Sequence, residues 1–310
     1  MSTASRGGRS ASLGARFLRS RYDYLYVLPA LGVMLLVIAY PIYYTIHLSF
    51  FSTPPSLAMA DKVFVGFDNY IRVLQSSSFH ETTINTLEWT FYSTFFAMVL
   101  GFGAALVLNR AFYGRAILRG ILLIPFVISA VAASYIWRWI YHSDFGVLGA
   151  VLIQLGFTDE PLNLLDNVDR VLAALIVVNV WKEFPFAMIM ILAGLQTVPE
   201  QLLRAAQVDG ASTLQRFLHV TLPHLKGVLT VTVLLLFVAN LNHFTIPWIM
   251  TGGGPAGASD IWITQIYQIA FGRIRFGIAS AYSVILFLVM VVIGYFYVRA
   301  LSSNDERRPG

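Results

Sequence analysis

Six long apolar stretches dominate the pattern of hydrophobic and polar positions along this chain. Each is long enough to cross about 30 Å of hydrocarbon, which takes roughly 20 residues of α-helix. The stretches cover approximately residues 24–48, 84–108, 117–141, 170–194, 224–248 and 278–300. This pattern predicts an all-α, polytopic membrane protein with six transmembrane helices. It divides the chain into an N-terminal tail at 1–23, a transmembrane domain at 24–300 and a C-terminal tail at 301–310.

Composition supports a membrane protein over a soluble one. Hydrophobic residues make up 57% of the chain and charged residues only 12%, whereas soluble domains carry about 25% charged residues. A large soluble α/β core would break its apolar runs with charges much more often. The chain also has no cysteine, which excludes disulfides, thiolate metal sites and cysteine nucleophiles.

The first apolar stretch has two interpretations, because five arginines precede it, as in a secretory signal peptide. The stretch is longer than a typical signal core and continues through Ala39, Tyr40 and Pro41 without a clean cleavage site. We therefore expect an uncleaved first span. The preceding arginines are Arg6, Arg9, Arg16, Arg19 and Arg21.

The distribution of Lys and Arg predicts the orientation, because cytoplasmic segments are enriched in both. With the N-terminus in the cytoplasm, 14 of the 21 basic residues lie in inside segments and 7 in outside segments or outer membrane halves. Both termini are therefore expected in the cytoplasm, and the net charge of +5 requires no nucleic acid as a partner. Outer loops are expected near 49–83, 142–169 and 249–277, and inner loops near 109–116 and 195–223.

The longer inner loop reads as a helix, a glycine and a second short helix across residues 199–222. Pro199 suits a first helical turn, and Glu200 favours the positive end of the helix dipole. Gly210 can end this helix in a left-handed conformation, and Ser212 or Thr213 can cap the next one. We expect Pro223 to separate this second helix from the fifth span.

This loop is either an ordinary amphipathic connector or a docking element for a soluble partner. In a docking element, the small side chains of Ala205 and Ala206 would permit close approach. Phe217 and Leu218 would then supply apolar contacts.

One motif in the loop resembles the EAA loop of bacterial ABC importer permeases. The pattern is Ala205-Ala206-x-x-Asp209-Gly210-Ala211, followed by Phe217 and Leu222-Pro223. The resemblance implies that the loop supplies a coupling helix that seats in a separate ATPase subunit. Arg204 departs from the family pattern, which usually has Glu at this position. In the family, that Glu is expected to contact a basic groove on the ATPase. Glu200, one turn earlier on the same face, is the candidate substitute.

The resemblance extends along nearly the whole chain and favours the carbohydrate-uptake branch, of the maltose-permease or glycerol-phosphate-permease kind. The similar segments are Phe64–Tyr70, Asn85-Thr86, Pro125 with Trp137-Arg138-Trp139, Asp144–Leu148, Trp181-Lys182-x-x-Pro185-Phe186, Thr251–Pro255 and Tyr267-x-x-Ala270-Phe271. The family implies that Thr251, Gly252, Gly253, Gly254 and Pro255 face a solute-binding protein. A simple turn is the alternative for this segment. Trp137 and Trp139 are either interfacial anchors or part of an outer gate.

Polar side chains within the apolar stretches are candidates for the solute pathway, because charge in hydrocarbon is costly. Lys182 and Glu183 lie in the outer half of the fourth stretch. The fifth contains Asn240, Asn242, His243, Phe244 and Trp248, of which Asn240, His243 and Phe244 share one face of a regular helix. Each group has a structural alternative, namely pairing with a neighbouring helix or interhelical hydrogen bonding. The functional alternative for the fifth stretch is a sugar site, because amides hydrogen-bond to hydroxyl groups and aromatic rings stack on the C–H face of a sugar ring.

Several chemistries have no motif in the chain. It lacks a G-x-x-x-x-G-K-[ST] phosphate loop, an H-E-x-x-H motif and a nucleophile elbow, so no catalytic or metal site is expected. The resemblance implies that ATP and Mg bind partner subunits instead.

The resemblance implies a permease subunit in the bacterial inner membrane that imports a sugar-like solute. Its expected partners are membrane lipid, a second permease (as a heterodimer), two ATPases and a solute-binding protein. An ion-coupled secondary transporter is the alternative, although no inverted repeat is evident, and a membrane-embedded enzyme lacks a catalytic constellation. Monosaccharide, disaccharide, polyol, glycerol phosphate and sulfonated sugar all remain open as the solute.

Overall fold

The structure is a computed structural model that describes residues 26–53 and 62–305. The predicted N-terminal tail, with its five arginines, lies outside these residues, as does the end of the C-terminal tail. Five helical stretches are long and apolar enough to cross a membrane, and a bent pair of shorter helices makes up to six. The all-α, polytopic fold class is confirmed. The five stretches are Tyr26–Ser49, Ser77–Asn109, Val171–Gln196, Thr213–Thr251 and Phe276–Tyr297.

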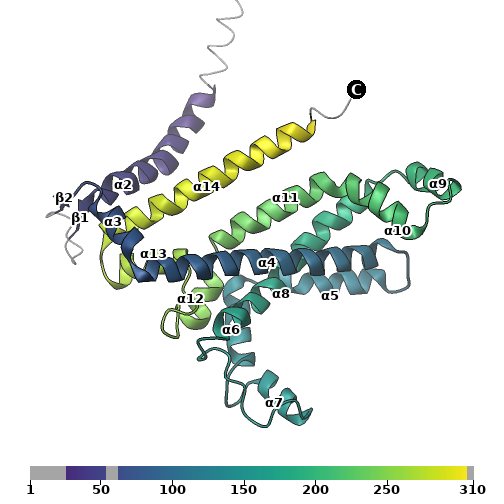
Figure 1. The fold of residues 1–310 in the computed structure, drawn as a ribbon, viewed down its shortest axis with the longest axis horizontal. Helices are drawn as coiled ribbons and strands as arrows, with labels where there is room; N and C mark the ends of the chain where they lie inside the picture. Colours follow the sequence, from purple (N-terminus) through teal and green to yellow (C-terminus); the bar gives the residue numbers. More distant parts are fainter. Residues whose placement is uncertain (1–25, 54–61, 306–310) are drawn as a thin grey trace, which may run out of the picture.

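Two uninterrupted helices, α4 (Ser77–Asn109) and α8 (Val171–Gln196), form the centre of the bundle (Figure 1). They approach closely at Gly101, where an added Cβ would lie 2.5 Å from the Cβ of Ala187 and 2.9 Å from the carbonyl oxygen of Phe184. Small residues permit such close backbone approach between membrane helices. This contact fixes the frame on which the broken spans rest.

The third span is not the continuous helix that the apolar stretch 117–141 suggested. Its two halves, α5 (Arg115–Val127) and α6 (Ala130–Ile140), are bent by 96° at the break. Ile128 is extended, and the Ser129 hydroxyl caps α6 by accepting from the Ala132 N–H at 3.2 Å. Ser129 thus starts a new helix within an apolar run, so hydrophobicity alone could not show the bend. A short helix, α7 (Val147–Gln154), follows.

The predicted separation at Pro223 is also wrong. Helix α10 (Thr213–Arg216) passes through the π-helix η3 (Phe217–Thr221) directly into α11 (Leu222–Leu241). Proline is tolerated because it occupies the first turn of α11 and lacks only an N–H. The π-turn keeps the helix continuous, since the Leu222 N–H bonds to the Phe217 carbonyl.

The fifth span breaks at its other end instead. Helix α11 ends at Leu241, and α12 (Thr245–Thr251) begins after three residues. The regular helical face expected for Asn240, His243 and Phe244 is therefore interrupted.

The short elements between the first and second spans lie at the end of the bundle opposite helix α9 (Glu200–Val208) (Figure 1). The antiparallel strands β1 (Phe51–Ser52) and β2 (Val63–Phe64) pair near α3 (Asp68–Gln75). The Asn69 amide donates to the Ser49 and Phe51 carbonyls at 2.8 and 2.9 Å, which anchors α3 to the first span. That span contains η1 (Leu35–Ala39) and α2 (Tyr40–Ser49), and the chain ends with α13 (Trp262–Tyr267), η4 (Gln268–Gly272) and α14 (Phe276–Asp305).

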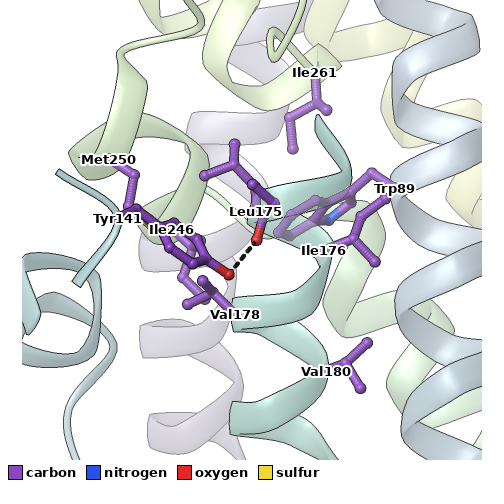
Figure 2. Packing of buried hydrophobic residues seen from close by; sticks show 10 residues of the cluster. Trp89, Tyr141, Leu175, Ile176, Val178, Val180, Ile246, Met250 and Ile261 are labelled. Atoms are coloured by element: carbon purple, nitrogen blue, oxygen red, sulfur yellow. Dashed lines mark hydrogen bonds between the residues drawn. The ribbon is translucent and has the colours of Figure 1, made fainter. Parts of the chain in front are cut away.

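A buried apolar cluster joins α4, α6, α8 and α12 (Figure 2). Trp89 and Leu175 are fully buried in it, and the Tyr141 hydroxyl donates to the Ala174 carbonyl at 3.4 Å. The cluster holds the two short helices that follow the breaks against the uninterrupted α8.

Candidate functional site: two broken spans and two loops

A fully buried asparagine, Asn240, is the centre of a hydrogen-bond network at the end of α11. The Asn179 amide of α8 donates to its side-chain oxygen at 2.6 Å, and its own amide donates to the Thr94 hydroxyl of α4 at 3.2 Å. The Trp89 indole N–H donates to its backbone carbonyl at 3.0 Å. The network therefore joins three helices where the fifth span breaks, and in this conformation Asn240 is enclosed by protein.

Lys182 and Glu183 lie beside the other break. The Lys182 ammonium donates to the Ile128 carbonyl at 2.7 Å, and this carbonyl lies at the turn between α5 and α6. Both side chains are half-buried. Non-helical backbone at membrane depth needs such partners, because lipid supplies no hydrogen bonds.

The residues of the second break differ in their surroundings. The His243 ring lies 5.8 Å from the Trp89 ring, and its Nε2 atom is buried without a hydrogen-bond partner. Asn242 is exposed, and its amide lies 3.1 Å from the Met290 sulfur. The structure thus brings Asn240 and His243 to the Trp89 side chain and directs Asn242 toward α14.

A chain of aromatic rings continues from this break along α12. Phe244 stacks on Trp248 with ring centroids 5.5 Å apart, and Tyr267 of α13 contacts both rings at 5.0 and 4.6 Å. These contacts fix the indole of Trp248 in one orientation.

The next segment, residues 252–260, forms what we call the glycine loop. Gly252 and Gly253 adopt positive φ angles of 61° and 87°, which favour glycine. An added Cβ on Gly253 would lie 2.7 Å from both the Asp260 carboxylate and the Gln268 amide. Two of the three glycines are therefore required by conformation and Gly253 also by space.

Hydrogen bonds from three directions hold the glycine loop in place. The Thr251 and Ser259 hydroxyls lie 2.7 Å apart, and the Gln268 amide donates to the Gly252 carbonyl at 3.0 Å. The Asn85 amide of α4 donates to the Gly257 and Asp260 carbonyls at 3.2 and 3.0 Å. In the sequence, Asn85 stood out only as part of a family motif. In the structure, its side chain anchors the glycine loop to α4.

Asp260 is a buried carboxylate beneath the glycine loop that sequence reasoning missed. It is 4% exposed and accepts from the Thr264 hydroxyl at 2.5 Å. Burial raises its pKa to about 6, although the Thr264 hydrogen bond and the nearby Arg273 charge act to lower it. A lone Asp in a polar loop gives no sequence signal for burial.

A cavity of about 560 Å³ opens beside the glycine loop. It lies between the end of α6, the end of α12 and the segment that precedes α8. The side chains and backbone that line it include Arg138, His142, Ser143, Asn163, Asp166, Trp248 and Pro255. Of the five residues predicted to face the binding protein, Thr251 to Pro255, only Gly253 is buried and does not line the cavity.

The loop predicted at 199–222, which we call the elbow, lies at the opposite end of the bundle (Figure 1). Gly210 joins α9 to α10 at φ 81°, and Ser212 and Gln215 form a capping box. The Arg216 guanidinium donates to the Gln207 side chain at 3.2 Å across the turn. The elbow is therefore a defined, internally bonded unit.

The elbow presents apolar side chains to its surroundings. Val208 is 87% exposed and Leu214 is 64% exposed. Phe217, a predicted apolar contact, lies 6.0 Å from the Phe102 ring of α4 and is half-buried within its own chain. Ala205 and Asp209 are exposed, whereas Ala206 and Ala211 are partly buried.

Arg204, which stands where the family usually has Glu, pairs with another residue of the elbow. Arg204 and Glu200 form an ion pair at 2.5 Å, and both side chains are 78% exposed. Glu200 is thus paired with Arg204 in the isolated chain. Among the described residues, no three His, Cys, Asp or Glu side chains are grouped to hold a metal ion.

Comparison with known proteins gives a consistent result. The family model described as "Binding-protein-dependent transport system inner membrane component" matches residues 97–304. The trehalose/maltose transport system permease protein MalF of Thermococcus litoralis is 34% identical over 287 residues, covering 92% of this chain and 95% of that protein. The sulfoquinovosyl glycerol transport system permease protein SmoG of Agrobacterium fabrum is also 34% identical, over 91% of this chain and 90% of its own length.

A solved structure supports the fold. A bacterial ABC transporter involved in the import of the acidic polysaccharide alginate matches with a TM-score of 0.79 and 24% identity, covering 93% of this chain and 97% of the other. The family model and the relatives of 34% identity confirm the sequence resemblance to importer permeases. This chain belongs to the binding-protein-dependent transport system inner membrane component family and is a permease subunit of an ABC importer, not an enzyme.

Proposed function

We propose that this permease imports a sugar or sugar-like solute across the bacterial inner membrane, with both termini in the cytoplasm. The names of its relatives refer to trehalose, maltose and sulfoquinovosyl glycerol, which supports a carbohydrate class of solute. The proposed assembly is a heterodimer with a second permease, two ATPase subunits that hold ATP and Mg, and a solute-binding protein that delivers the sugar.

The observation that carries the coupling part of this proposal is the exposed elbow. Val208 and Leu214 are exposed on this internally bonded turn and offer apolar surface that a partner can cover. We assign the contact with the ATPase to this surface, with Ala205, Asp209 and Gly210 at its centre. Each nucleotide state of the ATPase must bind one permease conformation better than the other for coupling to occur.

The glycine loop at the other end is assigned to the binding protein, and the polar groups at the two breaks to the solute pathway. Asn240 and His243 are enclosed in the present conformation. Their access to solute therefore requires α11 and α12 to move relative to α4.

The test is a mild-detergent pull-down of the tagged chain from native membranes, with partners identified by mass spectrometry. An ATPase and a second permease are expected with the wild type. The ATPase should be lost with the Asp209→Arg/Gly210→Pro variant, while the second permease is retained. Reconstituted complexes are then assayed for ATP-dependent uptake of radiolabelled trehalose, maltose and sulfoquinovosyl glycerol. A chain that purifies without an ATPase, or uptake abolished by an uncoupler but not by ATP depletion, would contradict the proposal.

A further inference from the structure

The geometry points to the cavity beside the glycine loop as a binding site for a neutral, polyhydroxylated solute, occupied before the solute enters the broken spans. This inference rests on the proposed function, because the cavity must face the side from which solute arrives. It assigns a solute-binding role to Arg138, Asn163 and Asp166, none of which lies at the breaks themselves.

The size of the cavity suits a small ligand. Its volume of about 560 Å³ lies within the range of roughly 300–1,000 Å³ typical of small-molecule sites. It is built from three chain segments far apart in sequence, namely the end of α6, residues 163–166 and the end of α12.

The lining supplies hydrogen-bond donors and acceptors in nearly balanced charge. Arg138 contributes a guanidinium and Asp166 a carboxylate, and Asn163 and Ser143 contribute neutral groups. Hydroxyl groups both donate and accept, so a sugar needs this mixture. An anionic ligand such as a phosphate would instead favour several cationic side chains.

Key lining groups are only lightly used by the protein itself. Among the described residues, no hydrogen-bond partner is found for the Asp166 carboxylate or the Asn163 amide nitrogen. Arg138 makes one long contact, from Nη1 to the Ile249 carbonyl at 3.4 Å. These groups can therefore bond a ligand without breaking internal structure.

Trp248 gives the cavity an aromatic wall. Its ring is held by Phe244 and Tyr267, as described above, and the ring stack leads from the cavity to the break in the fifth span. An aromatic face is suited to pack against the C–H groups of a sugar ring. Phe244 is the third residue after Leu241, where α11 ends, so the stack begins at the break in the fifth span.

The wall formed by the glycine loop is preorganised, which lowers the cost of binding. Gly252, Gly254 and Pro255 line the cavity, and the hydrogen bonds from Asn85, Ser259 and Gln268 fix the backbone of this loop. A wall held in this way needs no ordering when the solute arrives.

The first test uses the absence of native cysteine. Ser143→Cys places one thiol in the cavity with little change in size, and Ala150→Cys on α7 is the matched control, being exposed outside it. The full complex in proteoliposomes, without binding protein, is labelled with a membrane-impermeant maleimide. Trehalose and maltose at millimolar concentration are the neutral probes, sulfoquinovosyl glycerol, which carries a sulfonate, is the anionic comparison, and sodium chloride of equal osmolality is the blank.

A neutral sugar that the wild-type complex transports is expected to slow labelling of the Ser143→Cys variant by at least about 2-fold and to leave labelling of the Ala150→Cys variant unaffected. Equal labelling rates with every transported sugar would overturn the inference and leave the proposed function intact. ATP-dependent uptake of sulfoquinovosyl glycerol but of neither neutral sugar would overturn the inference and leave the proposed function intact, whereas uptake of none of the three would count against both. Because the binding protein is absent, protection cannot come from its docking.

The second test separates binding from turnover. Asp166→Asn replaces one carboxylate acceptor with an amide donor, and Asn163→Ala removes the side-chain amide. Each is expected to raise the apparent KM for uptake about 3- to 10-fold, with kcat unchanged. Asp159→Asn, in the same segment but outside the cavity, is the control. A lowered kcat with unchanged KM, or equal effects in the control, would contradict the inference.

Discussion

The ammonium of Lys182 lies 2.7 Å from the carbonyl oxygen of Ile128, so a side chain of the uninterrupted α8 satisfies the backbone of the broken third span. At the fifth span, the Trp89 indole of the uninterrupted α4 does the same for the Asn240 carbonyl. Two continuous helices thus each supply one N–H donor to a discontinuous neighbour. This arrangement follows from the rule that backbone at membrane depth must find protein partners.

Lys182→Met should therefore lower stability, because it leaves the Ile128 carbonyl without its donor. We expect a loss of about 1–3 kcal/mol in the free energy of unfolding, measured as a lower midpoint of thermal unfolding in detergent. Lys182→Gln keeps an N–H donor and should recover part of the loss. A variant with unchanged stability and a raised KM for uptake would instead place Lys182 in contact with solute.

Asn240→Ala should destabilise the chain much more than Asn242→Ala. The first substitution removes two buried side-chain hydrogen bonds, to Asn179 and Thr94, and leaves their polar groups unpaired, at a cost of about 2–4 kcal/mol. Asn242 is exposed and contacts only the Met290 sulfur. Thermal unfolding of the two variants side by side checks this, and similar midpoints would contradict the network described here.

Gly101→Ala should separate α4 from α8, because the new Cβ would meet backbone atoms of α8 as well as Ala187. Overpacking of this kind costs about 1–3 kcal/mol. Gly103→Ala is a matched control two residues away, where nothing lies within 4 Å of the added Cβ. The yield of folded chain in size-exclusion chromatography should fall for the first variant only.

Asp260 should make stability depend on pH. Its folded pKa of about 6 lies above its ordinary value of 3.8, so the folded state binds more protons between these values than the unfolded state does. The contribution of Asp260 to stability should therefore be most favourable at the acidic end and fall as pH rises from about 4 to 6, by at most about 3 kcal/mol. Asp260→Asn should lose this slope while other carboxylates titrate unchanged. An identical pH profile in both proteins would show that the carboxylate is not buried.

Glu200→Gln should leave the fold intact, because its exposed ion pair with Arg204 contributes only about 0.3–0.5 kcal/mol. If the Glu200→Gln variant no longer co-purifies with the ATPase, Glu200 therefore contributes to the contact between the elbow and the ATPase. Unchanged co-purification would show that the pair is dispensable for docking. The Arg204→Gln variant, tested alongside, separates a need for the cation from a need for the acid.

Hydrophobic length predicted the second, fourth and sixth spans to within several residues, because long apolar runs leave few alternatives for the backbone. Hydrophobic length could not predict the breaks in the third and fifth spans. The third span turns at Ser129 and the fifth stops after Leu241, in both cases inside apolar sequence, and only tertiary hydrogen bonds from Lys182 and Trp89 reveal why these turns are tolerated.

The candidate site could be predicted only in part from the sequence, because some of its residues depend on tertiary contacts. Glycines and the Ala-Ala-x-x-Asp-Gly pattern mark local backbone requirements, so the glycine loop and the elbow could be located from the sequence. Asp260, Asn163 and Asp166 gain their surroundings from segments distant in the chain. No local pattern distinguishes them from ordinary loop residues.

The continuity of α10, η3 and α11 gives the elbow a mechanical property. From Thr213 to Leu241 the chain is one uninterrupted rod, roughly 40 Å long at about 1.5 Å per residue. Because no loop separates the elbow from α11, a displacement of the elbow end would be transmitted along this helix toward Asn240, which is bonded to two other helices. The rod would then act as a lever whose output is applied at a polar joint.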